Sequence, residues 1–81
     1  MKHPSAVVHK TARIDVGAFI GAHVWIGGNA RIGAGAVIED NAVVCRYAEV
    51  GAGARVGSAA VVCASARVAS GSSLPAGAFA A

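Results

Sequence analysis

The sequence repeats with a period of six residues over almost its whole length. Every sixth residue from position 14 to position 74 is a branched aliphatic: Ile14, Ile20, Ile26, Ile32, Ile38, Val44, Val50, Val56, Val62, Val68 and Leu74. Val8 extends this series by one repeat toward the N-terminus. The residue two places before each aliphatic is small in nearly every repeat, and is usually alanine. A short fixed period is the signature of a repeat architecture. We therefore expect a single structural unit to be stacked many times.

The six-residue period favours strands over helices. Six is not close to a multiple of 3.6, so the aliphatic residues would spiral around a helix instead of lining one side of it. In a strand, the small residue and the aliphatic two places later point to the same side. Each hexad then predicts one short strand, with the small and the aliphatic side chains facing inward and the residue between them facing outward.

A corner is expected three residues after each aliphatic. Seven of the eleven residues there are Gly or Asn, which tolerate positive φ; the set is Gly17, His23, Asn29, Gly35, Asn41, Tyr47, Gly53, Ala59, Ser65, Gly71 and Gly77. Three hexads close one triangular coil of 18 residues, and parallel ladders would join successive coils. The predicted fold is an all-β parallel β-helix of about four coils without any helix, in which residues 1–5 lead in and residues 6–80 form one domain.

One predicted outer face is apolar. Residues 18 apart share a face, and the residue before each aliphatic points outward. One such column contains only apolar side chains: Val7, Trp25, Val43, Val61 and Phe79. Cys45 and Cys63 lie at the edge of the same face, one coil apart, where their spacing would permit a disulfide, although we expect two reduced thiols packed in an apolar contact. A contiguous exposed apolar face usually marks an interface.

Composition excludes several classes of protein. The net charge is +3 with 14% charged and 5% aromatic residues, so a nucleic-acid partner is not expected. No apolar run approaches the roughly 20 residues of a membrane span. Two cysteines do not make a disulfide framework, and MKHPSAVVHK has no apolar segment typical of a secretory signal. A cytoplasmic location is predicted. The outward column Arg13, Arg31, Glu49 and Arg67 is interpreted as a solvated charged face, with an acidic ligand as the alternative.

The hexad pattern over residues 4–79 closely resembles the hexapeptide-repeat family, whose members are left-handed parallel β-helices. The left hand is implied by this resemblance alone, because parallel crossovers are normally right-handed. Residues HPSAVVHKTARIDVGAFIGAHVWIG resemble the opening coils of sugar and lipid A acyltransferases, and SSLPAGAFAA resembles the exit from the last coil of many acetyltransferases. The resemblance implies a homotrimer with parallel prism axes. If the protein is an enzyme, it also implies a CoA thioester or acyl-carrier donor in a groove between subunits.

His23 is the candidate catalytic residue under this resemblance. Acyltransferases of the family place a histidine as general base against the acceptor, and the corner position of His23 projects it outward near Trp25. The alternative interpretation is a corner residue with positive φ and no catalytic role. Whether the protein is an enzyme at all stays open at this stage.

A metal centre is the less favoured alternative. The γ-class carbonic anhydrases of this fold bind zinc through three histidines from two subunits, and His3, His9 and His23 are the only histidines here. They cannot converge within one chain. Family enzymes usually insert a loop between coils and add a C-terminal extension, and neither is expected here. The sequence therefore favours a non-catalytic trimeric repeat module, with an active acyltransferase as the alternative, and no certain cofactor or metal.

Overall fold

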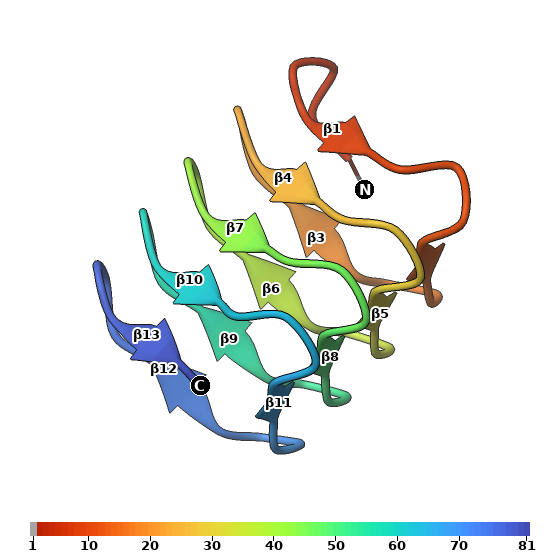
Figure 1. The fold of residues 1–81 in the computed structure, drawn as a ribbon. Helices are drawn as coiled ribbons and strands as arrows, with labels where there is room; N and C mark the ends of the chain where they lie inside the picture. Colours follow the sequence, from red (N-terminus) through yellow and green to blue (C-terminus); the bar gives the residue numbers. More distant parts are fainter. Residues whose placement is uncertain (1) are drawn as a thin grey trace.

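The protein folds as a stack of triangular coils. The computed structural model describes residues 2–81, measures 24 × 21 × 20 Å along its principal axes, and has a radius of gyration of 10.3 Å. Thirteen two-residue strands follow one another around the triangle (Figure 1) and form three parallel sheets that run the length of the stack. No helix occurs among residues 2–81, and hence none that could cross a membrane.

Each sheet collects every third strand. Sheet 1 contains β1 (Val7–Val8), β4 (Trp25–Ile26), β7 (Val43–Val44), β10 (Val61–Val62) and β13 (Phe79–Ala80). Sheet 2 contains β2 (Arg13–Ile14), β5 (Arg31–Ile32), β8 (Glu49–Val50) and β11 (Arg67–Val68). Sheet 3 contains β3 (Phe19–Ile20), β6 (Val37–Ile38), β9 (Arg55–Val56) and β12 (Ser73–Leu74). Every pairing is parallel and joins residues 18 apart, as in Trp25 with Val43, so the predicted coil length is confirmed.

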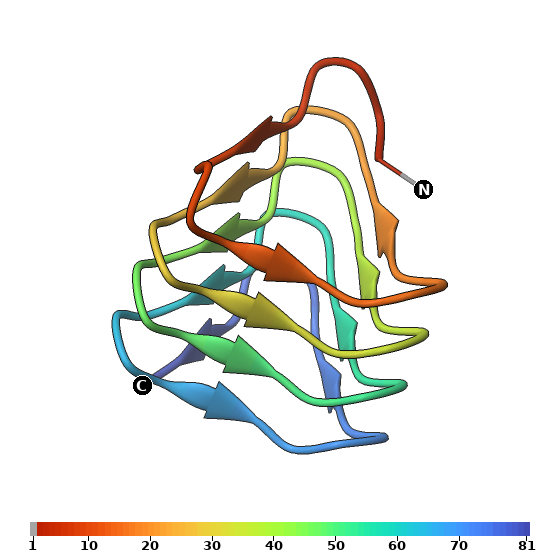
Figure 2. The same cartoon turned by 90° about the vertical axis from the view of Figure 1, so that its right-hand side faces the viewer.

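The winding is left-handed. Figure 2 looks at sheet 2 from outside: its strands run from left to right while successive coils descend, and the chain returns behind them along sheets 3 and 1. The all-β, left-handed, helix-free fold expected from the sequence is confirmed. The chain also pairs ahead of β1, because Lys2 forms a parallel bridge with Ile20 and the His3 N–H donates to the Ile20 carbonyl at 2.9 Å.

The interior is filled mainly by the two inward positions of each hexad, with Cys63 packed against its edge. The core consists of alanine at the small position and Ile or Val at the aliphatic one, with Val24 the single large residue at a small position. No polar or charged side chain is buried among the described residues. Ile20, Ile26 and Ile38 are completely inaccessible to solvent. Because an alanine and a branched side chain alternate around the triangle, each coil fills the centre without an aromatic side chain.

Positive φ marks every predicted corner. All eleven residues expected there have φ between 59° and 78°, and six of them are not glycine: His23, Asn29, Asn41, Tyr47, Ala59 and Ser65. Left-handed backbone costs an L-residue about 1–2 kcal/mol. A hydrogen bond to the preceding coil offsets this cost. The Tyr47 N–H donates to the Gly28 carbonyl at 3.0 Å, and the Ala59 N–H donates to the Asp40 carbonyl at 3.1 Å.

The first coil meets the second through side-chain hydroxyls. Ser5 and Thr11 occupy equivalent corner positions but do not adopt positive φ. The N–H groups of His23 and Asn29, instead of reaching a backbone carbonyl, donate to Ser5 Oγ and Thr11 Oγ1 at 2.9 Å each. Each hydroxyl in turn lies 2.8–2.9 Å from the Nδ1 atom of the histidine two residues earlier. Side chains therefore replace the backbone contact that joins the later coils.

A charge at an interior position should unfold the protein. Ile38→Asp would bury a carboxylate without a partner, at a cost of several kcal/mol against a total stability of about 5–10 kcal/mol. We expect loss of the cooperative thermal transition in circular dichroism. The matched control is Val37→Asp, which places the same charge one residue earlier on the outward side and should stay folded. A soluble, β-rich Ile38→Asp protein would show that the inward and outward positions are wrongly assigned.

The Thr11 hydroxyl should stabilise the junction of the first two coils. Thr11→Val keeps the shape of the side chain and removes the acceptor of the Asn29 N–H, so we expect a loss of about 1 kcal/mol in the free energy of unfolding. Thr11→Ser keeps the hydroxyl and serves as the control. Equal denaturant midpoints for the valine and serine variants would contradict a role for this hydrogen bond.

Candidate functional site

The apolar column predicted for one face lies along sheet 1. Parallel pairing places its members on neighbouring strands in register: Val7, Trp25, Val43, Val61 and Phe79. Trp25 is 48% exposed and Phe79 is 73% exposed. Apolar side chains thus cross all five strands of the sheet. The structure brings the five predicted residues of this column together on one surface.

A groove lies beside Trp25 at the corner between sheets 1 and 2. It has a volume of about 270 Å³ and is lined by Trp25, Cys45, Arg46 and Ala64. Gly27 allows the backbone to come close at this corner, because a Cβ atom on Gly27 would lie 2.5 Å from the Arg46 nitrogen. The absence of a side chain at position 27 thus lets the Arg46 turn sit directly against the preceding coil.

Cys45 and Cys63 follow β7 and β10 on this same corner. Both are free thiols and both are partly exposed. The Cys45 N–H donates to the Val62 carbonyl at 2.9 Å, and the Cys63 N–H donates to the Ala80 carbonyl at 2.8 Å. The cysteines therefore occupy equivalent positions on successive coils, as the 18-residue spacing predicts.

The charged column predicted for the next face lies along sheet 2. Arg13, Arg31, Glu49 and Arg67 are paired in register on neighbouring strands. Only Arg67 and Glu49 form an ion pair, with 3.7 Å between Nε and Oε1. Arg13, Asp15, Arg31 and Glu49 line a shallow groove of about 240 Å³. Since the arginine side chain of the ion pair is 78% exposed, it contributes little to stability, which agrees with a solvated face.

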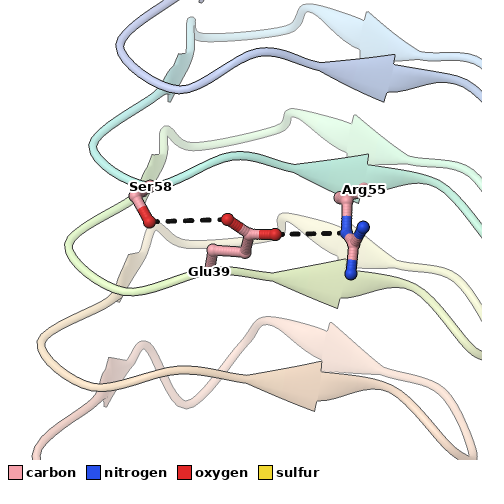
Figure 3. A network of polar contacts seen from close by, with 3 residues as sticks. All are labelled: Glu39, Arg55 and Ser58. Atoms are coloured by element: carbon pink, nitrogen blue, oxygen red, sulfur yellow. Dashed lines mark hydrogen bonds and ion pairs between the residues drawn. The ribbon is translucent and has the colours of Figure 1, made fainter.

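A second group of charges lies on and beside sheet 3 (Figure 3). Glu39 connects two neighbours on the next coil: its Oε2 atom is 3.1 Å from Arg55 Nε, and its Oε1 atom accepts a hydrogen bond from Ser58 Oγ at 3.4 Å. The hexad pattern does not predict this network. In the sequence, Arg55 and Ser58 lie 16 and 19 residues after Glu39. Both separations are within two residues of the 18-residue coil, which places the partners on successive coils.

His23 lies where the sequence places it, at an exposed corner with φ 59°. The corner follows β3 and precedes Trp25 of β4. The His23 backbone N–H donates to Ser5 Oγ, whereas no hydrogen bond joins the imidazole ring to another residue of the segment 2–81. A general base is normally oriented by a third group. The corner leaves His23 exposed, and no carboxylate among residues 2–81 orients its ring.

His3 and His9 have structural roles. The Nδ1 atom of His9 accepts the Thr11 backbone N–H at 3.2 Å and lies 2.9 Å from Thr11 Oγ1. His3 makes the same pair of contacts with Ser5. The motif His-x-Ser/Thr at positions 3–5 and 9–11 is the signal for these contacts, and the sequence analysis missed it. Among the described residues, no three His, Cys, Asp or Glu side chains come together to hold a metal.

Comparison with known proteins identifies the repeat. Residues 17–52 match the family described as bacterial transferase hexapeptide (six repeats). No curated protein matches the chain. The same geometry continues beyond the matched segment, since the 18-residue pairing extends from Val7 to Ala80 and the positive-φ corners from Gly17 to Gly77. Residues 17–52 are thus similar to the hexapeptide-repeat family, and the coils on either side repeat the same geometry.

Proposed function

We propose that the protein is a self-assembling structural module, a homotrimer held together through the outward side of sheet 1. The observation that carries the proposal is the apolar column across all five strands of that sheet. A monomer rarely leaves so continuous an apolar surface in water. Sheets 2 and 3 carry arginines in their outward columns, so sheet 1 is the face best suited to association.

The size of the interface extends the proposal to the corner beside the column. A standard interface takes about 800 Å² from each partner, close to a fifth of the 4379 Å² accessible surface of the chain. We therefore expect the interface to extend beyond the column to the neighbouring Cys45 and Cys63. In a closed three-fold assembly the contact is heterologous, so sheet 1 of one subunit meets a different surface of the next subunit. Tyr47, 59% exposed at a corner next to sheet 1, is suited to this contact.

Trp25 should dominate the assembly, since aromatic residues near the centre of an interface carry much of the binding energy. Trp25→Glu should convert a particle of three times 7.9 kDa into monomers in sedimentation equilibrium. Phe19→Glu is the matched control, because Phe19 is 46% exposed on sheet 3 and Trp25 is 48% exposed on sheet 1. An unchanged particle mass for Trp25→Glu, or dissociation by Phe19→Glu, would remove sheet 1 from the interface.

A second candidate function is acyl transfer from a CoA thioester, with His23 as general base. It is favoured by the transferase description of the matched family and by the exposed position of the ring beside the proposed interface. Fold by itself does not determine function, and the unoriented ring makes the structural module our first choice. Two free cysteines agree with a cytoplasmic location for either function.

Substitution of His23 separates the two candidates. For a structural module, His23→Asn should leave the melting temperature and the particle mass unchanged, because asparagine tolerates positive φ, and neither protein should be stabilised by CoA or acetyl-CoA in a thermal shift assay. For an acyltransferase, the wild type should turn over an acyl donor, and His23→Asn should lose about 10²–10⁴ in rate while keeping its fold. The second pattern would replace our first choice.

A further inference from the structure

The two thiols of the sheet 1 corner are held at a fixed separation by the ladder. Val44 pairs with Val62, and Cys45 and Cys63 directly follow these paired residues. Their Cα atoms are therefore one coil apart, about 4.8 Å in a parallel ladder. The side chains extend from equivalent positions, both are reduced, and both are partly accessible. The fold thus presents a preformed dithiol at the edge of the proposed interface; acyl transfer does not use it, and the structural module uses it only as apolar contact area.

We propose that Cys45 and Cys63 together bind one Cu(I) ion through both sulfurs. A metal–thiolate bond is about 2.3 Å long, so two such bonds on opposite sides of an ion span about 4.6 Å, close to the ladder spacing. Rotation about χ1 can adjust the sulfurs over the remaining difference. The geometry suits a two-coordinate ion between successive coils, with no movement of the backbone.

The number of ligands selects the metal. Structural zinc takes four protein ligands, and iron–sulfur clusters take four cysteines. In the part of the chain that the structure describes, no third His, Cys, Asp or Glu joins the two sulfurs. His9 is in the same corner column, but Gly27 lies between it and Cys45, and its Nδ1 atom is occupied by Thr11. A pair of soft thiolates without further ligands is suited to Cu(I).

Arg46 completes the charge balance of the site. Binding releases one proton from each thiol, so two thiolates and one monovalent cation leave a net charge of −1. Arg46 directly follows Cys45, lines the groove with it, and forms no ion pair with any residue of 2–81. The two glutamates of the chain, Glu39 and Glu49, pair with Arg55 and Arg67 instead. The Arg46 guanidinium is thus available to offset the charge of the bound complex.

Competition for Cu(I) against bathocuproine disulfonate, whose Cu(I) complex is coloured, tests the site with reduced protein under nitrogen. We expect the wild type to withdraw one Cu(I) per chain and to change the fluorescence of Trp25, the only tryptophan. Cys45→Ser and Cys63→Ser should each weaken binding by more than about 100-fold, because loss of a second-shell partner alone costs 10–100-fold. Arg46→Gln should weaken it several-fold and leave the stoichiometry at one.

The controls separate this site from the proposed assembly. Ser65→Ala, two residues beyond Cys63, should bind as the wild type does. Trp25→Glu should still bind one Cu(I) per chain, since both sulfurs come from the same chain; retained binding by a monomer supports the site whatever the outcome for the trimer. Failure of the wild type to withdraw Cu(I), one ion per two chains, undiminished binding by Cys63→Ser, or equally tight binding of Zn²⁺ would each overturn the assignment.

Discussion

The structure depends on the stacking of equivalent apolar side chains along the interior of the prism. Each hexad contributes one branched aliphatic and one small residue, and parallel pairing places each aliphatic directly against its equivalent on the next coil. The strands have only two residues, too few for any of them to be stable alone. Stability therefore comes from repetition, because each coil buries its apolar side chains only when another coil covers it.

The fold also requires a sharp corner between successive strands. A triangular path needs a sharp turn after every strand, and the chain meets this need with positive φ at residues as unsuited to it as Tyr47 and Ala59. Their N–H groups donate to the coil before them. The cost of each left-handed residue is thus offset by a bond that also holds two coils together. At the first coil the acceptors of these bonds are the side-chain hydroxyls of Ser5 and Thr11 instead of backbone carbonyls.

Sequence periodicity predicted the fold because interior positions tolerate few residue types. The hexad spacing predicted the inward and outward positions, all eleven positive-φ corners, and the neighbours on each face. The hand of the coil came from the family resemblance, since the six-residue period does not set it and parallel crossovers are normally right-handed. The hexad pattern could not predict contacts between flexible side chains. The link from Glu39 to Arg55 and Ser58 depends on rotamers, and the roles of His3 and His9 depend on turn geometry confined to one coil.

The same logic explains why this fold constrains function so weakly. Interior residues are almost interchangeable from coil to coil, whereas outward residues at equivalent positions range from Trp25 to Arg31 and Ser73. The ladder determines only where outward residues lie. Any two outward residues that are 18 apart in the sequence are one coil spacing apart in the structure, whatever their chemistry. A chemically useful site can arise when compatible residues recur at that interval. Sheet 1 is where such recurrence is densest here, with five apolar side chains in one column and two thiols in the next.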